Sequence, residues 1–311
     1  MKPKVCSVLF FLLLPFLFSG CAGAEPVKAE NITSCDIVIP GLTKEYNFLF
    51  LTDTHIIISD EQEEQQVKDY TQSRLPVFNT EENKTSVPQL DEWITYANQQ
   101  KYDGLLLGGD IIDFPSAANI DYLAFSLKKL EIPYLYTPGN HDWTYPWEYM
   151  TEKGKENYLS LLSPYMEDNP AIHTLEYEDF IIVAINNSSN QIDPDALQTY
   201  KSILSEGKPV IVLMHVPLYT DSVLAKSKEE WNSGVVLGGG IHGGIYPDAV
   251  STEFLQLTLA KTSPVAAILS GHVHLSDTSE VLGDKNIPQI TGDAGYKGIG
   301  TRIHISGSKS E

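Results

Sequence analysis

The chain has 311 residues, 42% of them hydrophobic and 20% charged, a composition that describes a globular protein with a substantial core and excludes a disordered chain. Its formal net charge is −20, from 41 acidic and 21 basic residues, so its surface repels polyphosphate backbones and an extended nucleic-acid interface is not expected. A small phosphorylated substrate held through metal ions is compatible with this charge.

The N-terminal residues have the pattern of an export signal. Two lysines precede an apolar run of about 14 residues, Val5 to Phe18, which is too short to span a bilayer comfortably. The run ends in Phe-Ser-Gly-Cys21, which resembles a bacterial lipoprotein signal with Phe where Leu is commoner. The resemblance implies a signal peptide over residues 1–20, lipid attachment to Cys21 and a tether over residues 21–35, which would fix the protein to a cell-envelope membrane. Cleavage after Ala24, which would release a soluble secreted protein, is the alternative.

The cysteines agree with this prediction. Cys6 would leave with the signal and Cys21 would carry the lipid, which leaves Cys35 alone. No disulfide is therefore expected.

Residues 36–311 are predicted to form one domain, because no internal repeat or low-complexity linker interrupts them. Short apolar runs predict strands, several of them buried on both faces, at 46–52, 104–108, 133–137, 180–186, 209–214, 266–270 and 301–306. A hairpin is predicted to join 173–177 to 180–186. Helical patterns lie between the strands, at 87–100, 117–130, 151–165, 194–205 and 249–261. The alternation predicts an α/β fold.

Five of the predicted strands end in residues that can bind metal ions. The strings that follow them are TDTH, GGDIID, PGNHD, MH and SGHVH, which contain Asp53, His55, Asp110, Asp113, Asn140, His141, Asp142, His215, His272 and His274. Each group alone has an ordinary explanation, such as a helix cap, a turn or a core histidine. In open α/β sheets, however, ligands bind beyond the carboxyl ends of strands, so the five groups can converge on one edge. Their common position favours a shared metal site.

This ordered pattern resembles that of the calcineurin-like metallophosphoesterases: D-x-H, G-D-x-x-D, G-N-H-[DE], a lone His and G-H-x-H, from Asp53 to His274. The resemblance implies a four-layer α-β-β-α sandwich, in which two mixed sheets are flanked by helices and a dinuclear metal centre lies at the strand carboxyl ends. Asp53, His55 and His274 would hold the first metal ion. Asn140, His215 and His272 would hold the second, and Asp110 would bridge the two.

The implied ligands are oxygen and nitrogen atoms without a thiolate, which favours Mn, Fe, Zn or Co as the two divalent ions. The ions would lower the pKa of a shared water and direct the resulting hydroxide in line at phosphorus. His141 would protonate the leaving group or contact a substrate oxygen, with Asp142 orienting it and Asp113 bracing a metal ligand. A turn-capping role for Asp142 and a helix-starting role for Asp113 are the alternatives. Purple acid phosphatases carry an iron-binding Tyr at the position of Asp113, so an iron–tyrosinate centre is not expected here.

Two variable stretches, Asp60–Val87 and Trp231–Asp248, are predicted to shape the substrate pocket. Arg74 in the first could bind a phosphate, and His242 in the second could contact substrate; a solvated charge and a turn residue are the alternatives. Trp143, Tyr145 and Trp147 could stack on an aromatic leaving group or belong to the core.

The function predicted is an exported, membrane-anchored, metal-dependent phosphoester hydrolase. Small nucleotide diesters and phosphomonoesters are both possible substrates, because a dinuclear centre serves either reaction. The alternative is a binding or envelope-structural lipoprotein on the same fold without turnover, which would have no need of a proton donor at His141. The sequence leaves the oligomeric state open.

Overall fold

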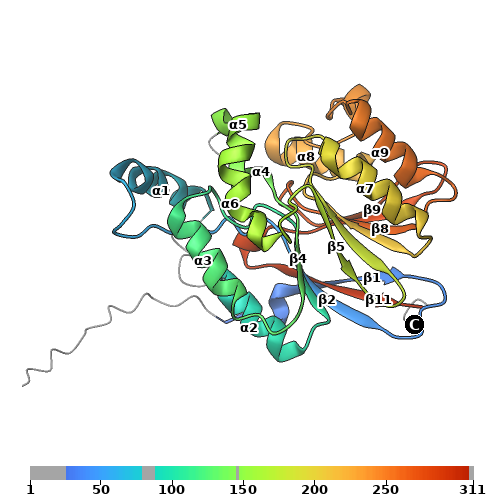
Figure 1. Ribbon diagram of the computed structural model, residues 1–311, viewed down its shortest axis with the longest axis horizontal. Helices are drawn as coiled ribbons and strands as arrows, with labels where there is room; N and C mark the ends of the chain where they lie inside the picture. Colours follow the sequence, from blue (N-terminus) through green and yellow to red (C-terminus); the bar gives the residue numbers. More distant parts are fainter. Residues whose placement is uncertain (1–25, 79–87, 145–146, 308–311) are drawn as a thin grey trace, which may run out of the picture.

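The computed structural model describes residues 26–78, 88–144 and 147–307, which form two sheets packed face to face with helices on both outer faces (Figure 1). The first sheet has the strand order β1-β11-β2-β3-β4. Its strands are β1 (Ile32–Val38), β2 (Tyr46–Leu51), β3 (Gly104–Leu107), β4 (Tyr134–Tyr136) and β11 (Gly300–Ser306). The second sheet has the order β5-β6-β7-β8-β10-β9. Its strands are β5 (Ile172–Glu176), β6 (Ile181–Ile185), β7 (Val210–Leu213), β8 (Val265–Ser270), β9 (Asp277–Val281) and β10 (Ile287–Thr291).

Both sheets mix parallel and antiparallel pairs. Strands β2, β3 and β4 run parallel, as do β6, β7 and β8, while β11 pairs antiparallel with β2 and the predicted hairpin joins β5 to β6. The carboxyl ends of the parallel strands β2, β3, β4, β7 and β8 carry the predicted ligand groups.

Strand β2 shows why the apolar runs fold this way. Phe48 and Phe50 face the other sheet and pack in a cluster with Ile182 and Leu213, while Leu49 and Leu51 face the outer helices. A strand that is covered on both faces needs apolar residues at every position, which is the pattern that the sequence shows.

The outer layers come from helices with one buried face. On the first sheet they are α2 (Leu90–Gln100) and α3 (Ala117–Leu127), and on the second α7 (Pro194–Ser205) and α9 (Ala249–Leu259). The remaining helices are α1 (Gln65–Phe78), α4 (Asn140–Thr144), α5 (Glu152–Gly154), α6 (Ser160–Leu162) and α8 (Asp221–Trp231). The predicted four-layer sandwich is confirmed. Among the described helices, none combines the length and the apolar character that a bilayer span requires.

Three details differ from the sequence-based expectation. Strand β1 begins at Ile32 and pairs in parallel with β11, so residues 32–35 belong to the sheet and not to the predicted tether. Helix α1 lies within a stretch predicted as a loop. The helix predicted over 151–165 is broken, because a π-helical turn at Lys155–Leu159 separates α5 from α6 and a 3₁₀ turn follows at Ser163–Tyr165.

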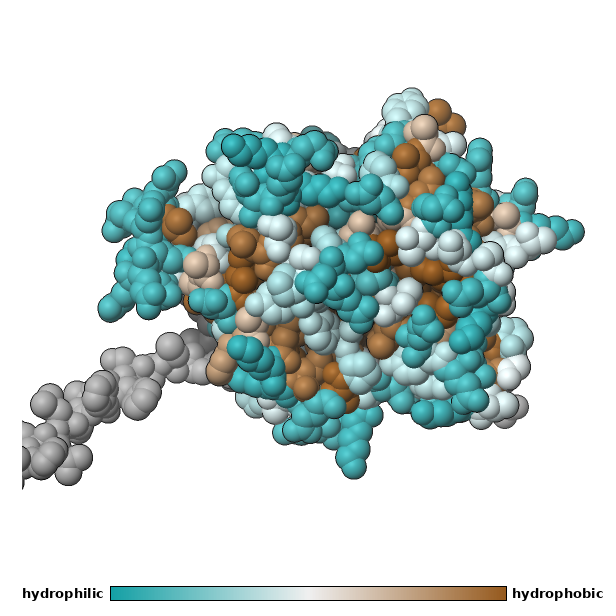
Figure 2. Space-filling model, viewed as in Figure 1, coloured by the Kyte–Doolittle hydropathy of each residue, from teal (hydrophilic) through white to brown (hydrophobic). Residues whose placement is uncertain are grey.

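Hydrophilic side chains cover much of the face shown in Figure 2, interrupted by smaller hydrophobic areas. This agrees with the 20% of charged residues in the sequence.

Candidate metal centre

The turns after five strands bring the predicted ligand residues into one buried cluster between the ends of the two sheets. The first group joins atoms from two turns of the first sheet and one of the second: Asp53, His55, Asp110 and His274. The second group consists of Asp110, His215 and His272. Within each group the candidate ligand atoms all lie within 4.8 Å of one another. Asp110 belongs to both, as the predicted bridging residue should.

The distances place Asp110 between the two groups. Its Oδ2 atom lies 3.2 Å from Nε2 of His215 and 3.8 Å from Nε2 of His55. On the first side, His274 Nε2 lies 3.2 Å from Asp53 Oδ1. One carboxylate oxygen therefore faces an imidazole from each group.

Hydrogen bonds on the outer nitrogen atoms orient two of these imidazoles. Nδ1 of His55 lies 3.0 Å from Asp113 Oδ1, and Nδ1 of His215 lies 2.8 Å from the carbonyl oxygen of Gly108. When Nδ1 carries the proton, the Nε2 lone pair is directed inward, which is how ligating histidines are usually held. Asp113 is therefore positioned to hold the His55 ring in this orientation.

The inner nitrogen atoms of the imidazoles face one another in pairs. His55 Nε2 is 3.1 Å from His274 Nε2, and His272 Nδ1 is 3.2 Å from His215 Nε2. Burial lowers the pKa of His55 to about 4 and that of His272 to about 3, so both imidazoles are neutral at pH 7. Neutral nitrogen lone pairs converging on carboxylates fit bound cations.

His215 carries the opposite shift. Burial alone would lower its pKa, but the carboxylates of Asp110 and Asp53 together raise it to about 9. A cation between these groups would take the place of that proton.

Asn140 adds an unsatisfied acceptor at the same place. Its Oδ1 atom is buried and has no hydrogen-bond partner among the described residues, and the residue lines a cavity of about 190 Å³ with Asp110, His272 and His274. A buried amide oxygen without a donor is costly, and a metal ion would satisfy it. The donor set therefore fits two divalent cations.

His141 lies on the wall of this cavity. It is not a member of the two groups that share Asp110, although it also forms a third group of possible metal ligands with His55 and Asp113. Its Nδ1 atom lies 3.1 Å from both the carbonyl oxygen and Oδ1 of Asp113. Burial would lower the pKa of His141, but Asp110 and Asp113 together raise it above its ordinary value, which favours the protonated form that an acid catalyst needs.

Asp142 has another role than the one predicted. Its Oδ2 atom accepts hydrogen bonds from the backbone N–H groups of Asp110 and Gly139, and Oδ1 accepts one from Ile112. The carboxylate against His141 Nδ1 is that of Asp113. Asp142 ties two strand-end turns together, which is the turn-capping alternative.

Arg74 also differs from its predicted role. From helix α1, its Nε donates to Asp113 Oδ2 at 2.7 Å and its Nη2 donates to Oδ1 at 2.9 Å. This bidentate pair and the two histidines hold the pKa of Asp113 well below its usual range, although burial acts in the opposite direction. Arg74 therefore fixes the carboxylate that orients His55 and His141, and its contact with a substrate phosphate stays a prediction.

Neither His242 nor Trp143 is among the residues that line this cavity. His242 stacks on Tyr219 with ring centroids 4.9 Å apart and lines a different pocket, with Ser279 and Leu282. Trp143 is buried and its Nε1 donates to Ser188 Oγ, so it belongs to the core. Cys21 and Tyr145 lie outside the described residues, and the side chain of Trp147 is not described.

The sequence analysis missed three aromatic residues that surround the metal ligands. Phe78 stacks on His55 with centroids 3.9 Å apart, and Tyr296 lies edge-on to both His55 and His274. Trp231, 42% exposed, lines the cavity and meets the His274 ring edge-on at 4.9 Å. Phe78 and Trp231 lie in the two stretches predicted to shape the pocket, but nothing in the sequence distinguishes Tyr296 from a core residue.

The strand-end turns need an unusual backbone. Five ligand residues have positive φ angles: Asp53 (52°), His55 (43°), Asp110 (51°), His272 (71°) and His274 (57°). Gly139 is required for a different reason, because a Cβ atom there would lie 2.1 Å from Asp110 Oδ1. Such strain is typical of functional sites.

Comparisons with known proteins agree with this geometry. Residues 46–276 match the family model described as calcineurin-like phosphoesterase. An uncharacterized metallophosphoesterase of Helicobacter pylori is 25% identical over 297 residues, covering 94% of this chain. The alignment covers 66% of that relative, so the chain spans a little less than two thirds of its length.

Two solved structures align with most of this chain. A purple acid phosphatase from yellow lupin (Lupinus luteus) aligns with a TM-score of 0.50 and 14% identity, over 87% of this chain and 45% of its own. A dimetal phosphatase from Danio rerio aligns with a TM-score of 0.46 and 12% identity, over 81% of this chain and 88% of its own. Since the family model spans most of the sequence and the ligand residues of its motifs meet in one cluster, this chain belongs to the calcineurin-like phosphoesterase family.

Proposed function

We propose that the protein hydrolyses small phosphoesters at the cell envelope with two divalent metal ions, chosen from Mn, Fe, Zn and Co. The observation that carries the proposal is the position of Asp110, whose Oδ2 atom faces an imidazole of each ligand group. The bound ions would supply an activated water and neutralise charge on the phosphoryl oxygens.

The remaining chemistry belongs to the residues of this chain. The cavity beside the ligands brings His141 and Trp231 to the same small volume. His141, oriented by Asp113, would give its Nε2 proton to the leaving alkoxide. The half-exposed indole of Trp231 offers an apolar wall for the leaving group.

This arrangement favours catalysis over the alternative of a binding lipoprotein on the same fold. A binding site needs ligands for its ions but no oriented acid beside them. The chain keeps both the complete ligand set and the hydrogen bonds that orient His141.

Hydrolysis of bis(p-nitrophenyl) phosphate and of p-nitrophenyl phosphate tests the function and separates a diesterase from a monoesterase. We expect metal-dependent turnover of at least one ester, because the candidate ligands and His141 line the same cavity and the exposed side of Trp231 leaves that cavity accessible to substrate. EDTA should abolish it and Mn or Zn should restore it. No turnover of either ester with any of the four metals would contradict the proposal.

We also propose that the protein is exported and anchored through a lipid on Cys21. The support is the order of the first residues: a basic start, an apolar run and a cysteine after Ser-Gly. Strand β1 begins only at Ile32, so a short tether would separate the lipid from the domain.

Replacing Cys21 with Ser tests the anchor. The wild-type protein is expected in the membrane fraction and Cys21→Ser in a soluble fraction, since one residue would carry the attachment. Cys35→Ser is the matched control and should stay with the membrane. If Cys21→Ser also fractionates with the membrane, the anchor lies elsewhere.

A further inference from the structure

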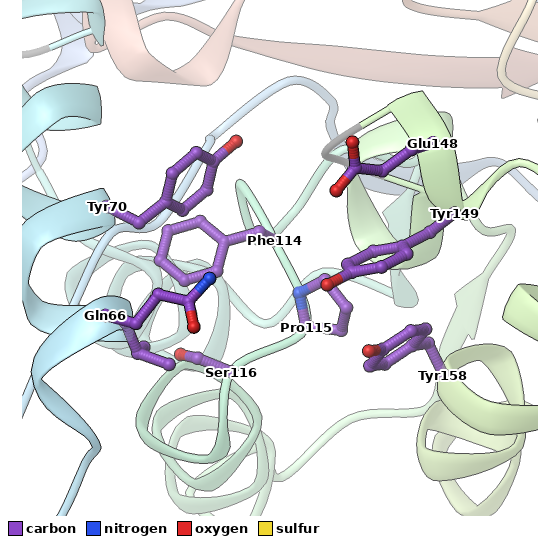
Figure 3. A pocket seen from close by; sticks show the side chains of 9 residues that line it. Gln66, Tyr70, Phe114, Pro115, Ser116, Glu148, Tyr149 and Tyr158 are labelled. Carbon is purple, nitrogen blue, oxygen red and sulfur yellow. The ribbon is translucent and has the colours of Figure 1, made fainter.

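A second pocket, of about 380 Å³, lies between helix α1, the loop that follows Asp113 and the short helices after α4 (Figure 3). Tyr70 and Phe114 stand on one side of it, and Tyr149 and Tyr158 stand on the other. None of these residues belongs to the metal-ligand cluster or to the cavity beside it. The volume is in the range of pockets that bind small molecules.

The four rings form two pairs that are inclined to each other. Tyr70 and Phe114 meet edge to face, with centroids 4.9 Å apart and an interplanar angle of 75°. Tyr149 and Tyr158 lie 4.9 Å apart at 33°. Parallel rings would make a slot for a flat molecule, whereas rings tilted in several directions make a concave wall suited to a rounded group.

The charges around the pocket are of one sign. The nine described residues that line it include one carboxylate, Glu148, and no basic side chain. Figure 3 shows Glu148 at the rim, above Tyr149. The whole chain carries a net charge of −20. An anionic ligand would therefore be repelled, while a cation would be attracted.

The backbone that presents Tyr158 is irregular. Tyr158 lies in the π-helical turn Lys155–Leu159, between α5 and α6. Isolated π-helical turns within α-helical segments occur frequently at functional sites, because the wider turn changes the direction of the side chains that it carries.

We propose that this pocket binds a small organic cation that carries a quaternary ammonium group. Aromatic faces attract such a group through the negative charge of their π systems, and a carboxylate at the rim adds direct attraction. A quaternary ammonium group needs no hydrogen-bond acceptor, which suits walls that are mostly carbon. The proposal is independent of the phosphoesterase reaction.

The experiment is calorimetric titration of the full-length protein with choline and, separately, with 3,3-dimethyl-1-butanol. The two probes have the same shape, but only choline is charged. We expect saturable binding of choline and no saturable binding of the neutral alcohol, because the rings and Glu148 act on the charge.

Two variants locate the site. Glu148→Gln and Tyr158→Leu should each weaken choline binding by about three- to tenfold, the factor expected from losing one charge or one ring. Glu206→Gln and Tyr246→Leu, at exposed positions elsewhere, are the matched controls and should bind choline like the wild type. Thermal unfolding checks that each variant folds.

Three results would overturn the proposal: no saturable choline binding, equal binding of the neutral alcohol, or choline binding that neither pocket variant weakens. Saturable binding of a flat neutral ring such as indole in place of choline would assign the pocket to an aromatic ligand and also reject the proposal. The probe pair needs no variant, so the test stands even if Tyr158→Leu fails to fold.

Discussion

Replacing His141 with Ala should lower kcat by about 10²- to 10⁴-fold, the usual contribution of a positioned general acid. His141 lines the cavity beside the ligands. Its Nδ1 atom is held by Asp113 and it is not a member of the two groups that share Asp110, so the variant should bind the same amount of metal as the wild type. Steady-state kinetics and metal analysis on the same preparation measure both quantities. The effect should be smaller for a nitrophenyl ester than for an alkyl ester, because nitrophenolate leaves without protonation.

His242→Ala is the matched control for this prediction. His242 stacks on Tyr219 away from the metal cluster, so its removal should leave kcat unchanged. An unchanged kcat in His141→Ala, with full metal content, would mean that the protein does not use this imidazole as its acid.

Replacing Asp110 with Asn should lower activity by at least about 10³-fold, since one carboxylate serves both ion positions and metal ions supply several kcal/mol of transition-state stabilisation. The amide is nearly the same size but lacks the negative charge that faces His55 and His215. Metal analysis after dialysis should show fewer than two ions per chain. The melting temperature should also respond less to added metal than that of the wild type.

The control is Asp121→Asn, an exposed carboxylate on helix α3. It should keep full activity and metal content. If Asp110→Asn retained two ions and wild-type turnover, the bridging position of Asp110 would be wrong.

The positions of the ligand residues could be predicted from the sequence because two simple rules determine them. Apolar runs buried on both faces identify strands such as β2 and β3, and the polar residues directly after them must lie at the strand ends. Since β2 and β3 run parallel in one sheet, Asp53 and Asp110 had to lie at the same edge. His215 follows β7 of the other sheet, so its approach to Asp110 depends on how the two sheets pack.

The roles of Asp113 and Asp142 could not be predicted in the same way. Both lie close in sequence to other site residues, but spacing does not determine the direction of a side chain within an irregular turn. In the structure, Asp142 faces backbone N–H groups and Asp113 faces two imidazoles and Arg74. The hydrogen bond between Asp113 and His55 agrees with a bracing role for Asp113, and the carboxylate beside His141 Nδ1 is that of Asp113 and not that of Asp142.

Helix α1 and strand β1 were missed for related reasons. Helix α1 buries only two residues, so it needs no continuous apolar stripe of the kind that identifies a helix in a sequence. It also contains Pro76, which is unusual inside a helix. Strand β1 has only one buried residue, Ile37, and depends on pairing with β11, almost the whole chain away, which no local pattern reveals.

The left-handed backbone at Asp53, Asp110 and His274 lowers the stability of the fold at residues whose side chains the candidate metal site needs. A non-glycine residue in this conformation costs about 1–2 kcal/mol, so glycine at any one of the three would relax the polypeptide while discarding a donor atom. Substitutions that raise the melting temperature of this protein should therefore be made in its sheets and outer helices. Glycine at one of these turns would increase stability but remove a residue of the candidate metal site.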